Sequence, residues 1–317
     1  MATLPRLTLI GTGGTIAGAA PAAADTTAYR AGALDPAALL AAVPGAAAHA
    51  TLDLLALLAI DSKDMSPSHW LSIARAVATR LAQPDCDGVV ITHGTDTLEE
   101  TAWFLHLVLP PGKPVVLTAA MRPASALSAD GPMNLLQAIA VAASPAAHGK
   151  GVLVVLNDTI FAGADIVKTH TRALDAIRAP ERGPLGTVLP VRFHTAPAHD
   201  SAGAVPLDTL AGRDALPRVD ILYVAAGSDP DLLATAAARG TAGVVLALPG
   251  NGSLPEAWRA AADAATAAGV RVLRASRVAA GAVSEEAGAL PASGERGPAK
   301  ARIALMLALA TGLATSI

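Results

Sequence analysis

The chain is poor in several residue types, and each scarcity narrows what the protein can be. Its 317 residues include one cysteine, Cys86, so neither a disulfide framework nor a thiolate metal cluster can form within the chain. Charged residues make up 15%, and the net charge of −3 offers no electrostatic footprint for nucleic acid. The only apolar run approaching about 18 residues lies near the C-terminus and has polar breaks, so we expect no membrane-spanning helix.

The sequence also lacks an apolar leader before its first predicted strand. That strand begins within a few residues of Met1, which leaves no room for a signal peptide. We therefore expect a cytoplasmic protein. A periplasmic mature form whose leader has been removed is the alternative.

Hydrophobic residues, in contrast, make up 52% of the chain, which is enough for a large buried core. The length predicts two domains, and apolar strands alternate with helical segments along the chain. We expect an α/β protein with a larger N-terminal doubly wound parallel-sheet domain over residues 1–190. A linker over residues 191–217 and a smaller C-terminal α/β domain over residues 218–317 would follow. We expect no cofactor and no bound metal.

Residues 9–18 (LIGTGGTIAG) are the first candidate for a functional loop. Glycine lets other groups approach the backbone closely, and a loop after a parallel strand lies where α/β sheets bind ligands. A dinucleotide fingerprint fails because Ile16 holds the place of its third glycine, and a phosphate-binding P-loop fails because Ala19 follows Gly18. Two interpretations remain. The glycine-rich loop either presents a threonine nucleophile, with Thr12 and Thr15 supplying the hydroxyls, or is a tight turn in which the threonines have no catalytic role.

Further polar residues follow other predicted strands. The strand over residues 88–91 runs into residues 92–96 (THGTD), which leaves Thr95 and Asp96 at the mouth of the sheet. His93 in this run is better explained as a hydrogen-bonded structural histidine than as a base. The following residues 97–100 (TLEE) match a helix capping box.

Two residues are ambiguous from their surroundings alone. Tyr29 lies in residues 19–32, a segment of small residues with proline and glycine that is typical of an active-site lid. Its phenol is either a surface anchor or a group that closes over the glycine loop. Lys168 is either a solvated lysine or one whose pKa is lowered by loss of solvation, so that its neutral amine can act as a base near neutral pH.

Taken together, these motifs resemble the bacterial-type L-asparaginase family of amidohydrolases. Residues 12–18 (TGGTIAG) look like the family's first threonine motif, and residues 92–101 (THGTDTLEET) are similar to its second. Supporting matches, in family order, are residues 61–65 (DSKDM), 121–123 (MRP), 128–132 (SADGP), 157–159 (NDT) and the segment around Lys168. The resemblance extends to Asn251 and covers essentially the whole chain.

The resemblance implies hydrolysis of L-asparagine to L-aspartate and ammonia through a threonine nucleophile and a covalent acyl-enzyme, with weaker glutaminase activity as an open expectation. It also implies a homotetramer built as a dimer of dimers, with sites at the dimer interface. From the net charge and the apolar runs we expect no nucleic-acid or membrane partner. The catalytic residues it implies are Thr12 as the nucleophile, Tyr29 as its lid partner, and Thr95, Asp96 and Lys168 as a second cluster. The substrate-binding residues it implies are Ser62, Lys63, Asp96 and Asn251.

Amide hydrolysis needs a nucleophile, a base, an oxyanion site and a protonated leaving amine, and this residue set can supply them. Whether Thr12 or Thr95 attacks is open at this stage. Thr12 is preferred because its loop is expected to be mobile.

Two positions depart from the family pattern. Lys63 stands where glutamine or serine is expected, and its ammonium either pairs with the substrate carboxylate, sharpening the choice between asparagine and glutamine, or points to solvent. The glutamate that a partner subunit contributes in the family has no clean equivalent, because Gly288 holds the aligned place and Glu285 and Glu286 lie near it.

Two other functions remain to be weighed. The asparaginase-like subunit of a tRNA-dependent amidotransferase is one, but the chain has no further tRNA-binding domain and no basic stripe. A metabolite sensor is the other, but binding alone needs no activated pair of hydroxyls.

Overall fold

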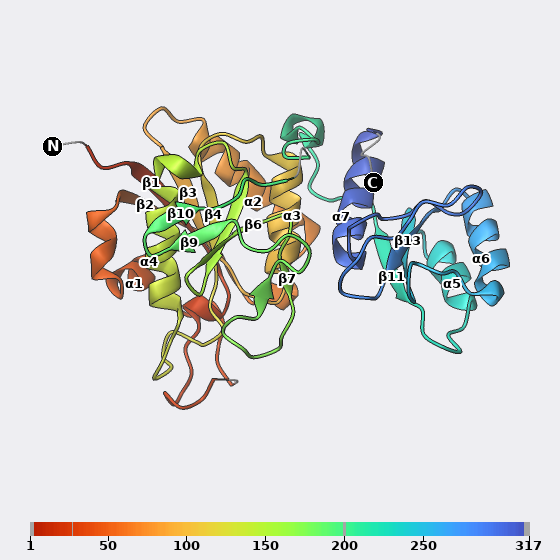
Figure 1. The fold of residues 1–317 in the computed structure, drawn as a ribbon, viewed down its shortest axis with the longest axis horizontal. Helices are drawn as coiled ribbons and strands as arrows, with labels where there is room; N and C mark the ends of the chain where they lie inside the picture. Colours follow the sequence, from red (N-terminus) through yellow and green to blue (C-terminus); the bar gives the residue numbers. More distant parts are fainter. Residues whose placement is uncertain (1–2, 27, 199–200, 314–317) are drawn as a thin grey trace. The chain divides into compact units, whose positions relative to one another are not determined.

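The computed structural model describes residues 3–26, 28–198 and 201–313. The chain divides into two compact units, one over residues 1–207 and one over residues 208–317 (Figure 1). The segment 191–217, expected to be a linker, begins with strand β10 (Val191–Phe193), which belongs to the first sheet, and contains the short 3-10 helix η5 (Leu207–Leu210). Among the helices of the described residues, none has the length and hydropathy needed to cross a bilayer.

An eight-stranded sheet forms the centre of the first unit, in the order β10-β9-β6-β5-β4-β3-β1-β2. Strands β2, β1, β3, β4 and β5 pair in parallel, and β6, β9 and β10 extend the sheet antiparallel. Their bounds are β1 Arg6–Gly13, β2 Thr51–Ile60, β3 Gly88–Thr92, β4 Val115–Thr118, β5 Val152–Leu156, β6 Thr159–Ala162 and β9 Gly186–Val188. A separate two-stranded pair consists of β7 (Val167–Lys168) and β8 (Ile177–Arg178).

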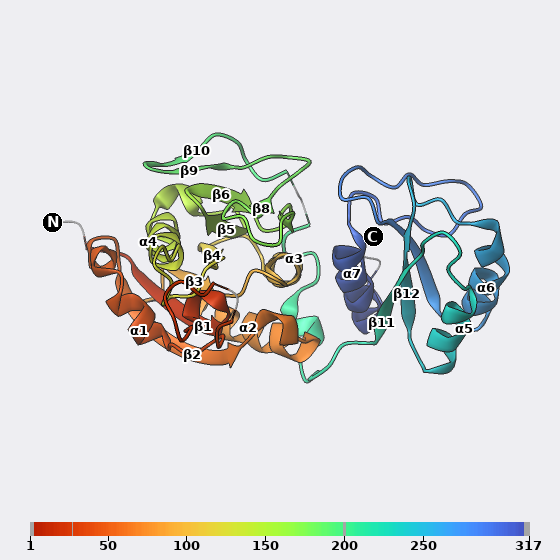
Figure 2. The same ribbon diagram turned by 90° about the horizontal axis from the view of Figure 1, so that it is seen from below.

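Helices cover both faces of this sheet (Figure 2). Helices α1 (Pro36–Ala41) and α4 (Gly131–Ala142) lie on one face, and α2 (Pro67–Leu81) and α3 (Leu98–Val108) lie on the other. Short 3-10 helices η1 (Thr15–Ala17), η2 (Pro44–Ala48), η3 (Ser62–Asp64) and η4 (Pro145–Ala147) connect the elements. As the sequence indicates, Asp35 caps α1 by accepting a hydrogen bond from the Ala38 N–H at 2.8 Å, with Pro36 in the first turn.

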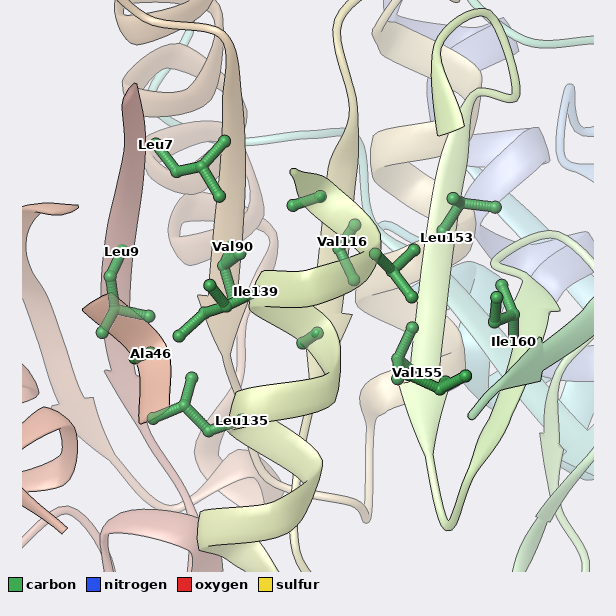
Figure 3. Close-up of a cluster of buried hydrophobic side chains, with 14 of the residues drawn as sticks. Leu7, Leu9, Ala46, Val90, Val116, Leu135, Ile139, Leu153, Val155 and Ile160 are labelled. Carbon is green, nitrogen blue, oxygen red and sulfur yellow. The ribbon is translucent and has the colours of Figure 1, made fainter. Parts of the chain in front are cut away.

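The core beneath α4 shows why the strands form a central sheet (Figure 3). Every residue of β3, β4 and β5 is buried, the pattern of strands covered on both faces. Leu135 and Ile139 of α4 pack in the same buried cluster as strand residues such as Val90, Val116 and Leu153. Burying side chains of this size contributes about 1.5–3 kcal/mol each.

The second unit is a smaller α/β layer structure. Its parallel three-stranded sheet consists of β11 (Val219–Tyr223), β12 (Gly243–Leu248) and β13 (Arg271–Ser276) in that order. Helices α5 (Asp231–Ala238) and α6 (Glu256–Ala267) share a buried cluster with the sheet, and α7 (Pro298–Thr311) lies on its opposite face (Figure 2). The predicted fold class, a large doubly wound domain and a smaller α/β domain, is confirmed.

The strand order locates the place where a ligand site is expected. Strand β1 lies between β2 and β3, so the connections that leave β1 and β3 diverge to opposite faces of the sheet. In open α/β sheets such a switch point opens a crevice at the carboxyl ends of the strands. The loops that follow β1 and β3 carry the two threonine motifs.

Candidate active site

Glycines bring the loops after β1, β2 and β3 into direct contact. Gly14 has a φ of 78°, and a Cβ on it would lie 2.4 Å from the backbone nitrogen of Gly94. A Cβ on Gly94 would lie 2.4 Å from the hydroxyl oxygen of Ser62. The three loops therefore approach one another as closely as only glycine allows.

Thr15 and Tyr29 form the first polar pair of the site. The Thr15 hydroxyl oxygen lies 2.6 Å from the Tyr29 phenol oxygen. The Tyr29 ring lies against Gly18, where a Cβ would come within 2.8 Å of the ring. Reciprocal backbone hydrogen bonds of 3.0 and 2.9 Å between Ala19 and Arg30 close the segment that carries the tyrosine. Tyr29 is thus a partner of Thr15 and not a surface anchor.

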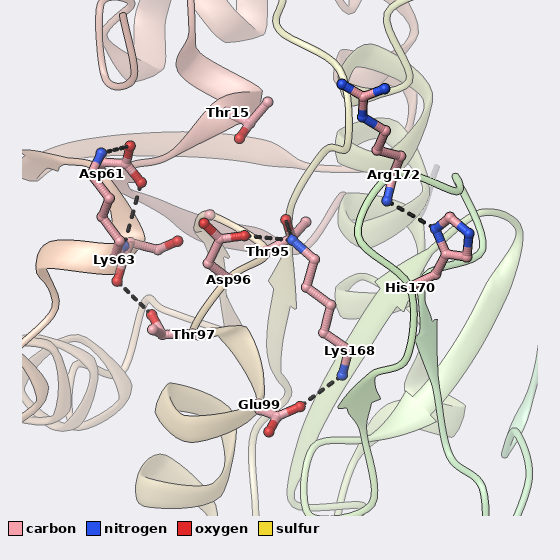
Figure 4. Close-up of polar contacts among 12 residues, drawn as sticks. Thr15, Asp61, Lys63, Thr95, Asp96, Thr97, Glu99, Lys168, His170 and Arg172 are labelled. Carbon is pink, nitrogen blue, oxygen red and sulfur yellow. Dashed lines mark hydrogen bonds and ion pairs between the residues drawn. The ribbon is translucent and has the colours of Figure 1, made fainter. Parts of the chain in front are cut away.

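Thr95, Asp96 and Lys168 form the second polar group (Figure 4). The Lys168 ammonium donates to the Thr95 hydroxyl oxygen at 2.9 Å and to Oδ1 of Asp96. The Lys168 side chain is 18% exposed, whereas that of Asp96 is 56% exposed. The lysine is therefore held between two partners, and the aspartate also reaches solvent.

Glu99 fixes the backbone of the lysine and was not among the candidates from sequence. Its Oε2 accepts a hydrogen bond of 2.7 Å from the Lys168 backbone N–H (Figure 4). Glu99 lies in the first turn of α3, the helix that follows the second threonine motif. An acidic side chain in the first turn interacts favourably with the positive end of the helix dipole. The sequence therefore explains Glu99 locally and gives no sign of its contact with Lys168.

The capping box predicted at the start of α3 is wrong. The Thr97 side chain makes no cap hydrogen bond. Its hydroxyl instead donates to the Ser62 carbonyl oxygen at 2.8 Å. Thr97 therefore ties the loop after β3 to the loop after β2.

One cleft of about 570 Å³ joins the two polar groups. Tyr29, Thr95, Asp96 and Lys168, all predicted from sequence, line it together with Thr15. The remaining lining residues are Ala23, Ala24, Thr26, Met121, Arg122, Ala126, Leu127, Ser128, Thr171 and Arg172. In the part of the chain that the structure describes, no group of three or more His, Cys, Asp and Glu side chains could hold a metal ion.

The preference for Thr12 as the nucleophile has to be corrected. Thr12 is still a residue of β1, is 1% exposed, and does not line this cleft. Its hydroxyl donates to the Thr92 carbonyl oxygen at 2.8 Å. Every residue of β1 from Leu7 to Gly13 is buried, and Thr12 is enclosed together with them.

The predicted substrate-binding residues other than Asp96 lie outside the lining of this cleft. Ser62 is buried against Gly94. Lys63 forms an ion pair with Asp61, and its side chain is 64% exposed. The hydrogen bond to Asp61 holds the pKa of Lys63 above its usual value. Lys63 is therefore a cation whose charge Asp61 balances.

Asn251 lies in the second unit. Its Oδ1 accepts a hydrogen bond of 2.9 Å from the Ser284 backbone N–H. Nearby, Glu285 accepts from the Ala292 backbone N–H at 3.1 Å, and Glu286 lies 3.7 Å from the buried guanidinium of Arg274. Asn251, Glu285 and Glu286 thus each have a partner within the second unit.

His93 is a structural residue, as predicted. Its Nδ1 lies 2.7 Å from the Gly94 carbonyl oxygen, and its Nε2 lies 3.0 Å from the Thr101 hydroxyl. A carbonyl only accepts, so Nδ1 carries the proton and Nε2 accepts from Thr101, which in turn accepts from the Trp70 indole at 3.1 Å. Complete burial lowers the pKa of His93 from 6.5 to about 4.

Comparisons with known proteins agree with the motifs and the fold. The family model "Asparaginase, N-terminal" matches residues 6–199, and "Glutaminase/Asparaginase C-terminal domain" matches residues 218–316. The chain belongs to the asparaginase family. Members of this family are named as L-asparaginases, so it is a family of amidohydrolases.

Similar members of the asparaginase family come from several bacteria. L-asparaginase 2 of Bacillus subtilis is 40% identical, over 96% of this chain and 83% of the relative. The Glutaminase-asparaginase of Acinetobacter glutaminasificans is 38% identical, over 95% of this chain and 94% of the relative. The crystal structure of a probable cytoplasmic L-asparaginase from Campylobacter jejuni superposes with a TM-score of 0.91, at 39% identity, over 96% of this chain and 95% of that one.

Proposed function

We propose that this protein is an L-asparaginase that hydrolyses the side-chain amide of L-asparagine to L-aspartate and ammonia. One observation carries the proposal: two hydroxyls, Thr15 and Thr95, line one cleft, and each has a partner able to handle a proton. The names of the relatives agree with this substrate.

Thr15 is the nucleophile in this proposal. A threonine hydroxyl attacks a carbonyl only if a neighbour takes its proton, and the Tyr29 phenol lies 2.6 Å away. A phenol can accept one proton while giving up its own, so Tyr29 relays the Thr15 proton toward the leaving amine. The Thr15 oxygen then holds the aspartyl group as an ester until water releases it.

Thr95, Lys168 and Asp96 act on the opposite side of the amide. The Lys168 ammonium donates to the Thr95 oxygen, which leaves the Thr95 O–H to point at the carbonyl oxygen as negative charge develops there. Asp96 accepts from Lys168 through Oδ1 and reaches solvent, so its second oxygen is available for the α-ammonium of the amino acid. One carboxylate can therefore serve the lysine and the substrate together.

The α-carboxylate of the substrate would lie toward the loop of Ser62, with Lys63 contributing to recognition, as the family resemblance implies. The resemblance also implies Asn251, a residue of the second unit, as substrate-binding. Weaker hydrolysis of L-glutamine belongs to the same proposal, and the Acinetobacter relative named Glutaminase-asparaginase supports it.

Ammonia release from L-asparagine and L-glutamine by the purified protein tests the proposal. We expect turnover of L-asparagine, and Thr15→Ala should lower kcat by roughly 10³-fold or more, as removal of a nucleophile does. Thr12→Ala should reduce kcat far less, because it removes one hydrogen bond inside the sheet. Release of ammonia from neither amide would contradict the proposal and favour a binding protein.

The assembly and the compartment are also proposals. We infer a homotetramer built as a dimer of dimers, which sedimentation of the purified protein tests by its mass. We infer a cytoplasmic location, supported by the name of the Campylobacter relative, although a relative from Haemophilus influenzae is named as periplasmic. Fractionation of the producing cell distinguishes the two compartments.

A further inference from the structure

The cleft continues past the catalytic group. Besides Thr95 and Lys168 it is lined by Thr171 and Arg172 and by residues of the loop after β4, namely Met121, Arg122, Ala126, Leu127 and Ser128. Figure 4 shows Arg172 on the far side of Lys168 from Asp61 and Lys63. The volume of about 570 Å³ falls within the range that drug-sized ligands occupy, which is more than L-asparagine fills.

This end of the cleft carries an excess of positive charge. Among the described residues that line the cleft, Asp96 is the one with a carboxylate, and its negative charge is neutralised by the ion pair with Lys168. Arg122 and Arg172 add two further cations to the same lining. We therefore expect this region to attract an anionic group.

Hydrogen bonds hold the Arg122 side chain and the backbone of Arg172. The Arg122 guanidinium donates to the Ser128 carbonyl oxygen at 3.0 Å, and its backbone N–H donates to Asp130 at 2.9 Å. The Arg172 backbone N–H donates to Nδ1 of His170 at 2.9 Å. The Arg172 guanidinium makes no hydrogen bond or ion pair with the residues that the structure describes, so its donors are available to a ligand.

We propose that Arg122 and Arg172 form a subsite for a carboxylate on the leaving amine, so that the protein also hydrolyses β-aspartyl amino acids. The proposal rests on the function proposed above. Arg122 and Arg172 line the same cleft as Asp96, Thr15 and Thr95, so a group on the amide nitrogen of a substrate bound there would share the cleft with both arginines. A guanidinium binds a carboxylate through two parallel hydrogen bonds, which suits the carboxylate of an amino acid released as the amine.

The reaction balances in the same way as asparagine hydrolysis. The Thr15 oxygen bonds to the β-carbonyl carbon, the bond from that carbon to nitrogen breaks, and the Thr15 proton ends on the departing amino group. Water then bonds to the same carbon, the ester bond to Thr15 breaks, and a proton returns to the Thr15 oxygen. The products are L-aspartate and a free amino acid.

Two substrates of matched size test the subsite. β-Aspartylglycine carries the carboxylate, and β-aspartylglycinamide replaces it with a neutral amide. We expect the protein to hydrolyse β-aspartylglycine with a kcat/KM roughly tenfold above that for β-aspartylglycinamide, because a charged hydrogen bond at a partly exposed site is worth about that factor. Equal values for the two compounds would overturn the proposal.

Two variants test whether the arginines cause the preference for β-aspartylglycine over β-aspartylglycinamide. Arg172→Gln should lower kcat/KM for β-aspartylglycine about tenfold more than for β-aspartylglycinamide. Arg178→Gln, which removes an exposed arginine paired with Asp175 outside the cleft, should keep the wild-type ratio. A ratio that survives in both Arg172→Gln and Arg122→Gln would also overturn the subsite.

Parallel assays with L-asparagine separate the two proposals. Hydrolysis of L-asparagine without hydrolysis of β-aspartylglycine would overturn the subsite and leave the asparaginase function standing. Hydrolysis of β-aspartylglycine without hydrolysis of L-asparagine would support the subsite and overturn L-asparagine as the substrate.

Discussion

Glu99 accepts a hydrogen bond of 2.7 Å from the backbone N–H of Lys168, so the first turn of α3 fixes the strand that carries the lysine. A hydrogen bond to a charged acceptor contributes about 1.5–3 kcal/mol. Glu99→Ala should therefore lower kcat for L-asparagine by roughly tenfold or more, because Lys168 loses its register against Thr95 and Asp96. Glu99→Gln keeps an acceptor at the same place and should lose less. Equal kcat values for the alanine variant and the wild type would remove Glu99 from the site.

Because Gly14 and Gly94 are in close contact, we expect a methyl group added at Gly14 to lower both stability and activity strongly. Gly14→Ala would put a Cβ 2.4 Å from the Gly94 nitrogen, at a φ of 78° that costs other residues about 1–2 kcal/mol. The two threonine loops must then separate, and we expect both Tm and kcat to fall, the latter more than tenfold.

Gly112→Ala is the matched control for this variant, because a Cβ at Gly112 meets no atom within 4 Å. It should keep the wild-type Tm and kcat. A Gly14→Ala protein as active and as stable as the Gly112→Ala protein would show that the loops do not need this approach.

His93 should make the free energy of unfolding depend on pH. The unfolded chain binds a proton at His93 below about pH 6.5, whereas the folded protein binds it only below about 4. Stability from this group is therefore complete above about pH 6.5 and is lost as the pH falls toward 4. The difference amounts to roughly 2 kcal/mol at about pH 5.

Urea unfolding of His93→Gln at about pH 7 and about pH 5 measures this dependence. The variant should be less stable at the higher pH, since it loses two buried hydrogen bonds, but its stability should fall less on acidification. His148→Gln, which removes an exposed histidine, should follow the wild type. Parallel pH profiles for His93→Gln and the wild type would contradict this account.

The ion pair between Lys63 and Asp61 predicts an effect on substrate binding. Lys63 balances a carboxylate in the residue that precedes Ser62, near the place proposed for the substrate α-carboxylate. Lys63→Gln leaves that negative charge unbalanced, so KM for L-asparagine should rise a few-fold with kcat nearly unchanged.

The double variant Asp61→Asn, Lys63→Gln should return KM toward the wild-type value, because it removes both charges and keeps a residue able to cap η3. If instead the single variant changes the ratio of asparagine to glutamine hydrolysis and the double variant does not reverse it, the ammonium contacts the substrate directly.

The sequence was sufficient for the fold and for the place of the two threonine motifs, because apolar strands followed by polar loops are local patterns. Tyr29 and Lys168 were ambiguous from their surroundings, and only the family resemblance grouped them with Thr95 and Asp96, with which they line one cleft. The preference for Thr12 over Thr95 rested on the expectation that Thr12 lies in a mobile loop. The strand β1 instead continues to Gly13, and every residue from Leu7 to Gly13 is buried, so Thr12 is part of the sheet interior. The sequence does not show where this strand ends.

Other features depend on contacts between distant segments and could not be predicted. Thr97 fits a local cap, yet the Ser62 carbonyl, which lies 35 positions earlier, takes its hydrogen bond. Glu99 reaches Lys168 across 69 positions, and Arg122 and Arg172 line one cleft although they come from two separate loops. Local propensity carries no information about such partners.

The most direct test of the account is to trap the acyl-enzyme during turnover of L-asparagine and to locate it by fragmentation mass spectrometry. We expect one aspartyl group esterified to the hydroxyl of Thr15, and no such adduct in Thr15→Ala. An aspartyl group on Thr12 or Thr95, or steady turnover by Thr15→Ala, would contradict the assignment of Thr15 as the nucleophile.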